Sequence, residues 1–447
     1  MKLFGTDGVR GKANTYPVTS EIALKLGKAA GIVLTKGKKK PIFIIGKDTR
    51  LSGYMLENAL TAGLTSMGAD VYLVGPMPTP AVAHLTRSFA ADAGIMLTAS
   101  HNPYTDNGIK FFDYKGHKLA DEVEEKIEKL VLNDELKTEH IGSKEIGRAY
   151  RIDDARGRYI EFAKSSIRNT SLKGLKIVLD CANGAAYKVA PLILSELGAD
   201  VVVLNNSPNG NNINQECGSL HPEIIKAAVL GHEADAGISL DGDADRIIMV
   251  DEKGNIIDGD YIIAIAALNM LKNKTLKHDT VVVTNYTNLA FDNLIKKNNG
   301  KIVRVKNGDR YVIEEMNKYD YNLGGEFSGH IIFSDFNSTG DGMVAGLQIL
   351  KIMKQKNKKL SELSSVLKKY PQVIVNVDVK EKKSFEKMKN VKEQIKKAED
   401  KLGDKGRHLI RYSGTEMKAR VMVEGEDLEE ITRWANNIAK EIKKEVG

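Results

Sequence analysis

The chain has 447 residues, with 66 lysines and arginines against 59 aspartates and glutamates, which gives a formal net charge of +7. So small an excess on so long a chain argues against a dedicated nucleic-acid-binding protein, which usually gathers basic charge on one face or arm. With 42% apolar residues and two cysteines, the chain fits neither the disordered, the collagen-like nor the disulfide-stapled class. Length alone predicts about three domains.

No targeting or membrane segment is apparent. The N-terminal residues lack the apolar core of a secretory signal, and the most apolar internal stretch, 261–271, is far shorter than the ~20 residues that span a bilayer. Cys181 and Cys217 follow no metal-binding spacing and fit a reducing compartment. We therefore expect a soluble cytoplasmic protein that binds neither nucleic acid nor membrane.

Short apolar runs alternate with amphipathic segments through most of the chain, which is typical of βα units on a largely parallel sheet. The expected elements are a helix at 20–34 capped by Ser20, strands at 41–45, 70–74, 94–97, 176–180, 200–204, 236–240, 246–250 and 280–284, a helix at 289–297 and a strand at 301–305. This pattern predicts α/β domains.

The pattern changes after Pro371. A strand at 373–379, a Lys/Glu-rich helix at 383–402, two strands flanking 411–418 and a helix at 427–444 follow one another. This β-α-β-β-α order predicts a small α+β domain.

The densest acidic cluster is Asp241-Gly242-Asp243-Ala244-Asp245, followed by Arg246 and set between two apolar strands. The small residues between the aspartates allow a tight turn, so that three carboxylates can converge on one hard cation such as Mg²⁺. The alternative is a polar turn whose aspartates cap local amides. Three alternating aspartates between apolar strands favour the metal site.

A serine follows the expected strand 94–97, in Thr98-Ala99-Ser100-His101-Asn102-Pro103. The carboxyl end of an α/β strand faces the ligand crevice, so Ser100 is either a nucleophile, phosphate carrier or metal ligand, or a turn residue beside Asn-Pro. Adjacent residues in a turn rarely point the same way, so we do not expect Ser100 to pair with His101. Lys110 is close enough in sequence to return to the crevice as a proton-transfer group.

Two further loops are rich in polar side chains. Arg411-Tyr412-Ser413-Gly414-Thr415-Glu416, with Arg420 beyond it, offers the guanidinium, hydroxyls and close backbone approach that a phosphate dianion needs, although such a composition is also common in ordinary loops. Gly324-Gly325-Glu326-Phe327-Ser328-Gly329-His330 supplies groups suited to sugar hydroxyls. His330 alone would more simply be a satisfied core histidine.

These four loops, in this order, resemble those of the α-D-phosphohexomutase superfamily, from Phe4 to beyond Arg420. Within it the similarity is greatest to the phosphoglucosamine mutase branch. Further motifs carry that similarity: Phe4-Gly5-Thr6-Asp7-Gly8-Val9-Arg10-Gly11, Gly157-Arg158-Tyr159-Ile160-Glu161-Phe162, Asn212-Ile213-Asn214 with Cys217-Gly218-Ser219, and Thr339-Gly340-Asp341-Gly342 with Ala345-Gly346-Leu347-Gln348.

The resemblance implies four domains rather than three. Three similar mixed-sheet α/β domains are expected at 1–152, 153–253 and 254–369, with the phosphoserine, metal-binding and sugar-recognition loops respectively. A smaller C-terminal α+β domain, 370–447, is expected to bind phosphate.

The resemblance also implies a role for each candidate residue. Ser100 carries the transferable phosphate and binds Mg²⁺ together with Asp241, Asp243 and Asp245. Sugar hydroxyls are recognised by Glu326, Ser328 and His330. The non-reacting phosphate is held by Arg411, Ser413, Gly414, Thr415 and Arg420, and the active-site cations are Arg10, Lys110 and Arg246.

Three residues depart from the branch. Ala244 stands where glycine is frequent, a small change unless the backbone needs a positive φ. Phe327 replaces the usual glutamine beside the sugar-recognition residues, which leaves open whether glucose and mannose phosphates are also used. Met417 stands where proline is common and should loosen the phosphate loop without removing a charged contact.

The predicted reaction is phosphoryl transfer from phospho-Ser100 to O1 or O6 of a hexosamine monophosphate. The resulting glucosamine 1,6-bisphosphate turns over and returns its other phosphate to Ser100, which interconverts glucosamine 6-phosphate and glucosamine 1-phosphate. Lys110 is the candidate proton acceptor, provided that its neighbours lower its pKa. A mobile C-terminal domain, hinged at 368–371, would let the intermediate rotate.

Three alternatives stand beside this prediction. They are a phosphomannomutase/phosphoglucomutase of broader sugar specificity, an aspartyl phosphatase or phosphotransferase with Asp241 as nucleophile, and a non-catalytic sugar-phosphate-binding protein. The aspartyl alternative leaves Ser100 without a role and lacks the expected hydroxyl residue at position 245. Retention of Ser100, the three aspartates and Lys110 argues for catalysis. The sequence is compatible with a homodimer.

Overall fold

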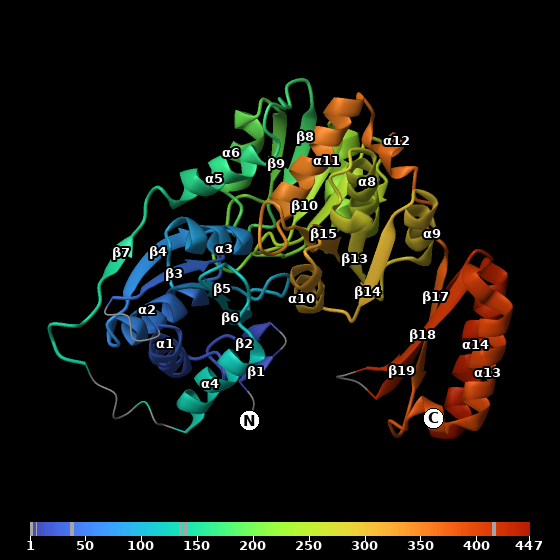
Figure 1. Ribbon diagram of the computed structural model, residues 1–447, viewed down its shortest axis with the longest axis horizontal. Helices are drawn as coiled ribbons and strands as arrows, with labels where there is room; N and C mark the ends of the chain where they lie inside the picture. Colours follow the sequence, from blue (N-terminus) through green and yellow to red (C-terminus); the bar gives the residue numbers. More distant parts are fainter. Residues whose placement is uncertain (1–2, 6, 36–39, 134–135, 137–140, 414–416) are drawn as a thin grey trace. The chain divides into compact units, whose positions relative to one another are not determined.

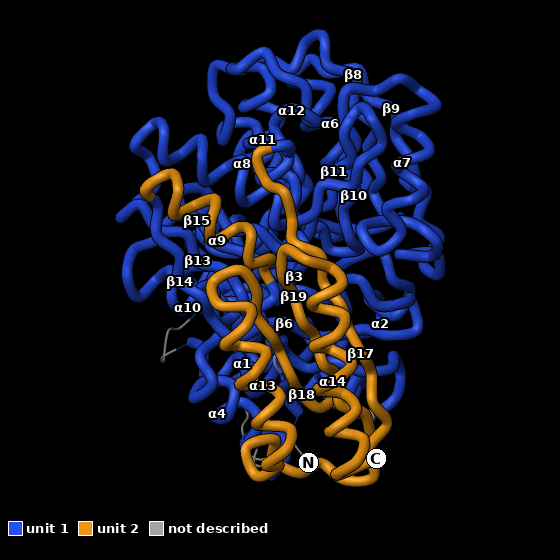
Figure 2. The backbone as a smooth tube through the Cα atoms, turned by 90° about the vertical axis from the view of Figure 1, so that its right-hand side faces the viewer, with its two compact units in different colours: residues 1–286, 300–365 blue, residues 287–299, 366–447 orange. Residues whose placement is uncertain are grey.

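The computed structural model describes residues 3–5, 7–35, 40–133, 136, 141–413 and 417–447. The described residues form four sheets (Figure 1). They fall into two compact units, 1–286 with 300–365 and 287–299 with 366–447, which Figure 2 colours separately. The first unit contains three sheets and the second contains one.

The first sheet has seven strands in the order β1-β2-β6-β5-β3-β4-β7. Pairing is parallel from β5 through β3 and β4 to β7 and antiparallel on the other side of β5. The core strands β3 and β5 are buried, as near-continuous apolar runs predict. The elements are β1 (Phe4–Gly5), β2 (Gly8–Lys12), α1 (Ser20–Leu34), β3 (Ile42–Lys47), α2 (Ser52–Thr65), β4 (Asp70–Pro76), α3 (Thr79–Ser88), β5 (Ala93–Leu97), β6 (Asp106–Asp113), α4 (Asp121–Leu132) and β7 (Ala149–Arg151).

Helix α1 has the predicted bounds, but Ser20 is not its cap. Thr19 is in an extended conformation, and its hydroxyl accepts a hydrogen bond from the backbone N–H of Ile22 at 3.3 Å. Ser20 is already the first helical residue, so it cannot supply the non-helical backbone that a cap requires.

The second sheet has five strands in the order β12-β11-β10-β8-β9. Strands β10, β8 and β9 are parallel, and β11 and β12 are antiparallel. The elements are α5 (Ala155–Ser165), β8 (Lys176–Asp180), α6 (Val189–Glu196), β9 (Asp200–Leu204), α7 (Pro222–Gly231), β10 (Ala236–Leu240), β11 (Ile247–Asp251) and β12 (Ile256–Ile257). Because β11 begins at Ile247 and not at Arg246, the arginine belongs to the preceding loop.

The third sheet has four strands in the order β14-β13-β15-β16, parallel except for β15 with β16. Helix α10 packs on β13 and β15. The elements are α8 (Gly259–Lys272), η2 (Lys277–Asp279), β13 (Thr280–Thr284), α9 (Leu289–Lys297), β14 (Lys301–Val305), α10 (Asp309–Tyr319), β15 (Leu323–Gly325), β16 (Ile331–Phe333), α11 (Gly342–Lys356) and α12 (Leu360–Ser364). Helix α9, although it lies between β13 and β14 in sequence, belongs to the second unit.

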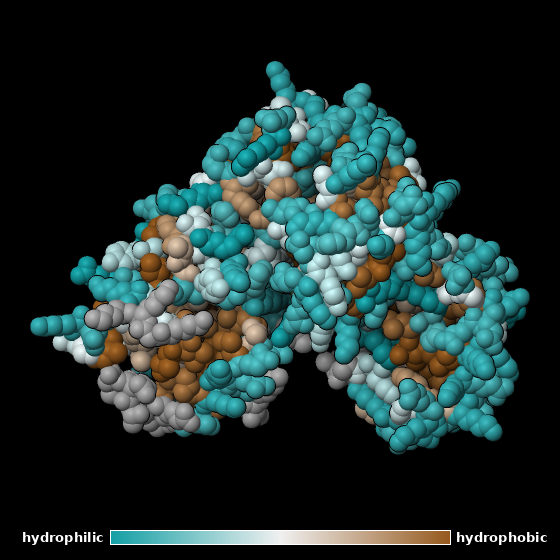
Figure 3. All heavy atoms as spheres, in the orientation of Figure 1, coloured by the Kyte–Doolittle hydropathy of each residue, from teal (hydrophilic) through white to brown (hydrophobic). Residues whose placement is uncertain are grey.

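The second unit contains the antiparallel sheet β17-β19-β18, with α13 and α14 packed against it. The predicted β-α-β-β-α order is confirmed: β17 (Gln372–Asp378), η3 (Phe385–Lys387), α13 (Lys389–Leu402), η4 (Gly403–Lys405), β18 (Gly406–Tyr412), β19 (Lys418–Gly425) and α14 (Leu428–Val446). The outer faces of α13 and α14 are hydrophilic in Figure 3, as expected for amphipathic helices on one side of a sheet.

Helix α13 begins six residues later than predicted. The Lys382 ammonium donates to the Ser413 carbonyl oxygen at 2.6 Å, and the Tyr412 hydroxyl donates to the Lys383 carbonyl oxygen at 2.6 Å. These contacts hold the predicted first turn against the end of β18. Among all described helices, none is both long and apolar enough to cross a membrane.

Candidate active site

The three sheets of the first unit share one local design. In each, a parallel strand is followed directly by an antiparallel return strand: β5 by β6, β10 by β11, and β15 by β16. The three loops singled out in the sequence are the connections between these strands, at 98–105, 241–246 and 326–330. Each loop therefore stays at the carboxyl end of a parallel strand, where ligands bind in α/β folds.

Ser100 lies in a strained turn beside the aspartate cluster. Its backbone has φ +53°, a left-handed conformation that is uncommon for serine, and its side chain is buried. The hydroxyl donates to Oδ2 of Asp241 at 2.7 Å, and the backbone N–H donates to Oγ1 of Thr98 at 2.8 Å. Such strain is typical of a functional residue that its surroundings hold in place.

Two side chains to which the sequence analysis assigns no role hold this turn. The buried Arg50 guanidinium donates to the carbonyl oxygens of Ser100 at 3.0 Å and of Asn102 at 2.8 Å, and also to that of Pro103. The side-chain amide of Asn214 donates to the first two of these oxygens at 2.9 and 3.0 Å. Asn214 belongs to the Asn212-Ile213-Asn214 motif of the family resemblance. Arg50, which follows β3, belongs to none of those motifs.

The expectation that Ser100 and His101 do not pair is wrong. Nδ1 of His101 lies 3.3 Å from the Ser100 hydroxyl oxygen, because the left-handed turn at Ser100 brings two consecutive side chains to the same side. Nδ1 also accepts from the guanidinium of Arg246 at 2.9 Å. Burial, together with Arg246 and Arg10, lowers the pKa of His101 to about 4, so its ring is a neutral acceptor near pH 7.

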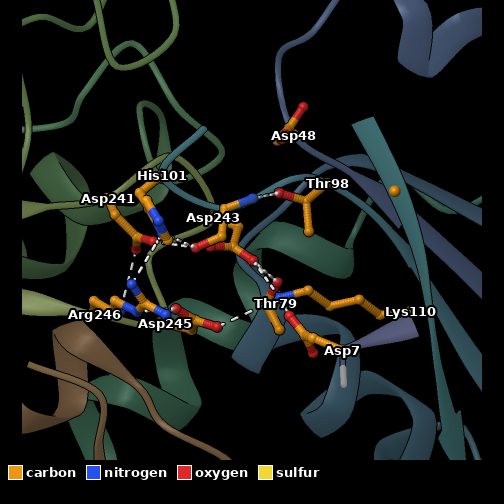
Figure 4. Close-up of polar contacts among 12 residues, drawn as sticks. Asp7, Asp48, Thr79, Thr98, His101, Lys110, Asp241, Asp243, Asp245 and Arg246 are labelled. Carbon is orange, nitrogen blue, oxygen red and sulfur yellow. Dashed lines mark hydrogen bonds and ion pairs between the residues drawn. The ribbon is translucent and has the colours of Figure 1, made fainter. Parts of the chain in front are cut away.

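The carboxylates of Asp241, Asp243 and Asp245 converge in the centre of Figure 4. All three are buried, and one oxygen of each lies within 4.8 Å of those of the others. Burial and the neighbouring Asp243 and Asp245 raise the pKa of Asp241 well above its usual value. Burial also opposes ionisation of Asp245, but Lys110 and His330 outweigh it and hold the pKa of Asp245 well below its usual value.

This cluster fits a divalent metal ion. Oδ1 of Asp243 and Oδ1 of Asp245 are buried and have no hydrogen-bond partner, a costly state for carboxylate oxygens. Carboxylate oxygens that converge without amide donors suit a hard cation. The alternative, that all three aspartates merely cap local amides, does not account for these two oxygens. Of the three aspartates, Asp241 accepts a hydrogen bond from one local amide, the N–H of Arg246, at 3.2 Å.

Lys110, on β6, returns to this cluster as the sequence predicted. Its ammonium nitrogen lies 3.1 Å from Asp243, 3.1 Å from Asp7 and 3.6 Å from Asp245 (Figure 4). Burial alone would lower the pKa of Lys110, but the three carboxylates raise it well above its usual value. The condition set for Lys110 to accept a proton, a lowered pKa, is therefore not met among these groups, and Lys110 is an ammonium.

The other two predicted cations flank the cluster. Arg246 contacts His101, as described above, and its pKa is raised because Asp245 and the other aspartates outweigh its burial. Arg10, on β2, donates to Oδ2 of Asp7 at 2.9 Å. Thr79, which the sequence did not single out, donates to Oδ2 of Asp243 at 2.6 Å from the first turn of α3.

Of the sugar-recognition candidates, His330 lies next to an aspartate of the cluster. His330 is buried, with Nδ1 3.7 Å from Asp245 and Nε2 accepting the N–H of Gly340 at 3.2 Å. The proton of its neutral ring therefore lies on Nδ1, facing Asp245. Burial opposes a second proton, but Asp245 and Asp309 outweigh it and raise the pKa of His330. Glu326 and Ser328 are half-buried, and Glu326 accepts the N–H of Gly308 at 3.1 Å.

The phosphate-loop candidates belong to the second unit. Arg411 on β18 and Arg420 on β19 are direct cross-strand partners, and Arg411 is exposed. Like charges directly opposite each other destabilise a sheet, so this pair is suited to an anion that both can contact. Ser413 is buried, and its N–H donates to the Lys418 carbonyl oxygen at 2.8 Å. Gly414 and Thr415 lie outside the described residues.

The three residues that depart from the pattern of the branch, Ala244, Phe327 and Met417, have different surroundings. Ala244 is buried with φ +56°, so the backbone there does adopt the positive φ that favours glycine. Phe327 is 46% exposed, with its ring 6.2 Å from that of Tyr286. Met417 is exposed, and its carbonyl oxygen accepts the N–H of Val379 at 2.9 Å.

Models of the phosphoglucomutase/phosphomannomutase family match four successive parts of the chain. The three alpha/beta/alpha domains match residues 1–138, 157–254 and 258–370, and the C-terminal domain matches residues 374–441. The phosphoglucosamine mutase of Geobacter metallireducens is 56% identical over 447 residues, which cover 100% of this chain and 99% of that protein.

Solved structures share the fold. A phosphoglucomutase/phosphomannomutase family protein from Burkholderia thailandensis superimposes with a TM-score of 0.80 at 24% identity, over 99% of this chain and 97% of that one. The N-acetylphosphoglucosamine mutase of Aspergillus fumigatus, crystallised with GlcNAc-6P and magnesium, superimposes with a TM-score of 0.66 at 19% identity, over 99% and 96% of the two chains.

Proposed function

Because the chain belongs to the phosphoglucomutase/phosphomannomutase family, we propose that it interconverts glucosamine 6-phosphate and glucosamine 1-phosphate through a phosphorylated Ser100. The observation that carries this proposal is the position of the Ser100 hydroxyl. It is 2.7 Å from Asp241, in a left-handed turn held by Arg50 and Asn214 at the edge of a buried carboxylate cluster.

A phosphate on Ser100 would give the cluster a fourth oxygen ligand. Asp241, Asp243 and Asp245 would hold Mg²⁺ together with it, and the Aspergillus relative was crystallised with magnesium. A divalent cation bound there offsets the carboxylate charge and polarises the phosphoryl oxygens.

The protein's own cations complete the electrostatics of phosphoryl transfer, which depends mainly on positioning and charge neutralisation. Arg246, Arg10 and Lys110 surround the carboxylate cluster. Neutral His101 accepts from Arg246 and so orients its guanidinium beside Ser100. Lys110, held as an ammonium, donates hydrogen bonds and positive charge to the oxygens of the group in flight, while the proton of the attacking sugar hydroxyl replaces the phosphoryl group on the Ser100 oxygen.

The remaining candidates position the sugar. Glu326, Ser328 and His330 would bind hydroxyls at the reacting end. Arg411, Ser413, Gly414, Thr415 and Arg420 would hold the phosphate at the other end. The intermediate would be glucosamine 1,6-bisphosphate, which must rotate before it returns a phosphate to Ser100. The cytoplasm is the proposed compartment, since Cys181 and Cys217 are buried free thiols whose pKa burial raises.

A coupled assay with glucosamine, glucose and mannose 6-phosphates tests this function. We expect kcat/KM to be highest for glucosamine 6-phosphate, and intact-mass analysis to show one phosphate on the active enzyme. Higher kcat/KM for the glucose or mannose ester would favour the broader phosphohexomutase, to which the exposed Phe327 beside the sugar loop also points. Binding without any turnover would favour a sugar-phosphate-binding protein.

A further inference from the structure

A second lysine, Lys118, lies near the cluster and has no part in the chemistry described above. It lies between β6 and α4, and its side chain is 14% exposed. Its ammonium nitrogen is 2.5 Å from Oδ1 of Asp7 and also donates to Oδ2 of Asp309, the first residue of α10. Burial would lower the pKa of Lys118, but Asp309 and Asp7 outweigh it, so the group stays charged.

These contacts continue into a closed ring of charged and polar side chains. Asp309 lies 3.8 Å from Nε2 of His330, and Nδ1 of His330 lies 3.7 Å from Asp245. Asp245 lies 3.6 Å from Lys110, which lies 3.1 Å from Asp7, and Asp7 returns to Lys118. Figure 4 shows the part of this ring in which Asp7 and Lys110 face the aspartates.

The ring joins loops from all three sheets of the first unit. Asp7, Lys110 and Lys118 come from the first sheet and its loops, Asp245 from the loop after β10, and Asp309 and His330 from the segment around β15 and β16. Of its six members, Lys118 contacts neither a predicted metal ligand nor a predicted sugar contact directly. Its two partners, however, each lie beside a candidate site residue: Asp7 lies beside the predicted cation Lys110, and Asp309 lies beside the predicted sugar contact His330.

We propose that Lys118 is a positioning residue for phosphoryl transfer, which holds Lys110 in place through Asp7 and holds Asp309 in place beside His330. Without its charge, two carboxylates would face each other across the gap that one ammonium now bridges, and their repulsion would move both. Asp7 would then draw Lys110 away from Asp243. Because displacement of a reacting group by about 1 Å costs on the order of 10²-fold in rate, the loss should appear in kcat.

This inference rests on the proposed mutase function, so wild-type enzyme and Ser100→Ala are measured in the same coupled assay. Lys118→Met keeps the length of the side chain and removes its charge, and Lys118→Arg restores the charge. Asp309→Asn breaks the same link from the other side with little change of shape, and it decides the question if Lys118→Met does not fold. Lys115→Met is the matched control, since Lys115 is exposed on the same loop.

We expect kcat to fall about 10²-fold in Lys118→Met and in Asp309→Asn, with KM within about threefold of wild type. The double variant should be little worse than either single variant, because both break one link. The kcat of Lys118→Arg should stay within about fivefold of the wild-type value, and the kcat of Lys115→Met should equal the wild-type value. An unchanged kcat, or a rise in KM alone, in folded variants would overturn the inference. An inactive wild-type enzyme would instead overturn the proposed function.

Discussion

The aspartate cluster of the first unit and the proposed phosphate loop of the second unit distribute charge in opposite ways. In the cluster, Lys110 and the three aspartates are buried, and the Lys110 ammonium faces the carboxylates of Asp243 and Asp245. In the loop, Arg411 is exposed and stands directly opposite another arginine.

This difference matches two tasks. Buried opposite charges fix one another before substrate arrives, which is the preorganisation that phosphoryl transfer requires. Cations that face each other across two neighbouring strands are stabilised when an anion arrives, so they suit a phosphate that must be captured and later released. The first region should therefore govern kcat, and the second should govern how well the intermediate is retained.

The strongest test of the buried region is removal of the phosphate carrier. Ser100→Ala should lower kcat by about 10⁴-fold or more, with substrate affinity within a few fold, since only the carrier is lost. Intact-mass analysis should lose one phosphate. Ser171→Ala, at an exposed serine, is the control. Normal turnover in Ser100→Ala would remove the basis of the comparison.

The next test addresses the carboxylates. Asp243→Asn replaces a charged ligand by a neutral one and should lower kcat about 10³-fold at low Mg²⁺, with partial recovery at high Mg²⁺. Asp251→Asn is the matched control, because Asp251 is also buried but caps the turn 253–255. Identical magnesium titrations for the two variants would show that the aspartate turn is only structural.

The exposed region is tested at Arg411. Arg411→Ala should lower kcat/KM by about 10²-fold and release free bisphosphate during turnover, because the remote clamp also positions the reacting end. Arg411→Lys should recover only part of the loss, since an ammonium lacks the guanidinium fork. Arg433→Ala, on an exposed face of α14, should behave as wild type. Normal KM without released bisphosphate would assign the loop another task.

Sequence patterns predicted some elements of the fold with the right bounds and missed others. Strands 176–180, 200–204 and 236–240 and helix 289–297 have the predicted bounds because each is a short apolar or strongly amphipathic segment. Strand β6, which carries Lys110, was not predicted, because Asp106 to Asp113 contains polar residues and a glycine that local patterns assign to a loop. Its pairing with β2 and β5 depends on residues far away in the chain.

The site shows the same limit. Motifs identified the candidate residues, because three alternating aspartates or a serine after a strand are visible locally. The groups that hold them were missed, since Arg50 and Thr79 act on partners 50 and 164 residues away. The contact between Ser100 and His101 was also missed, because it depends on a left-handed backbone at Ser100 that the residue types do not predict.

A weaker effect is expected from acid. His84, on α3, stacks on Phe162 of α5 with ring centroids 3.9 Å apart, and burial with Arg87 and Arg158 lowers the pKa of His84 to about 4. In the unfolded chain this histidine takes up a proton near pH 6.5. The contribution of neutral His84 to the free energy of unfolding is therefore complete above that pH and is lost as the pH falls toward 4. The loss should be about 2–3 kcal/mol. Urea unfolding of His84→Gln should depend less on pH than that of wild type, whereas His232→Gln, at an exposed position, should not differ.

The smallest expected effect concerns the backbone of the metal loop. Ala244 has φ +56°, which costs an L-residue about 1–2 kcal/mol, while Ala185 is equally buried in a nearby loop without a positive φ. Replacing either by glycine removes a buried methyl group, worth ~0.8 kcal/mol, and adds about 0.4–1 kcal/mol of unfolded-state entropy. Ala185→Gly should therefore destabilise by about 1–2 kcal/mol in urea unfolding. In Ala244→Gly the released strain should cancel most of that loss. Equal losses in the two variants would mean that the aspartate loop stores no strain, and that its charges alone distinguish it from the phosphate loop of the second unit.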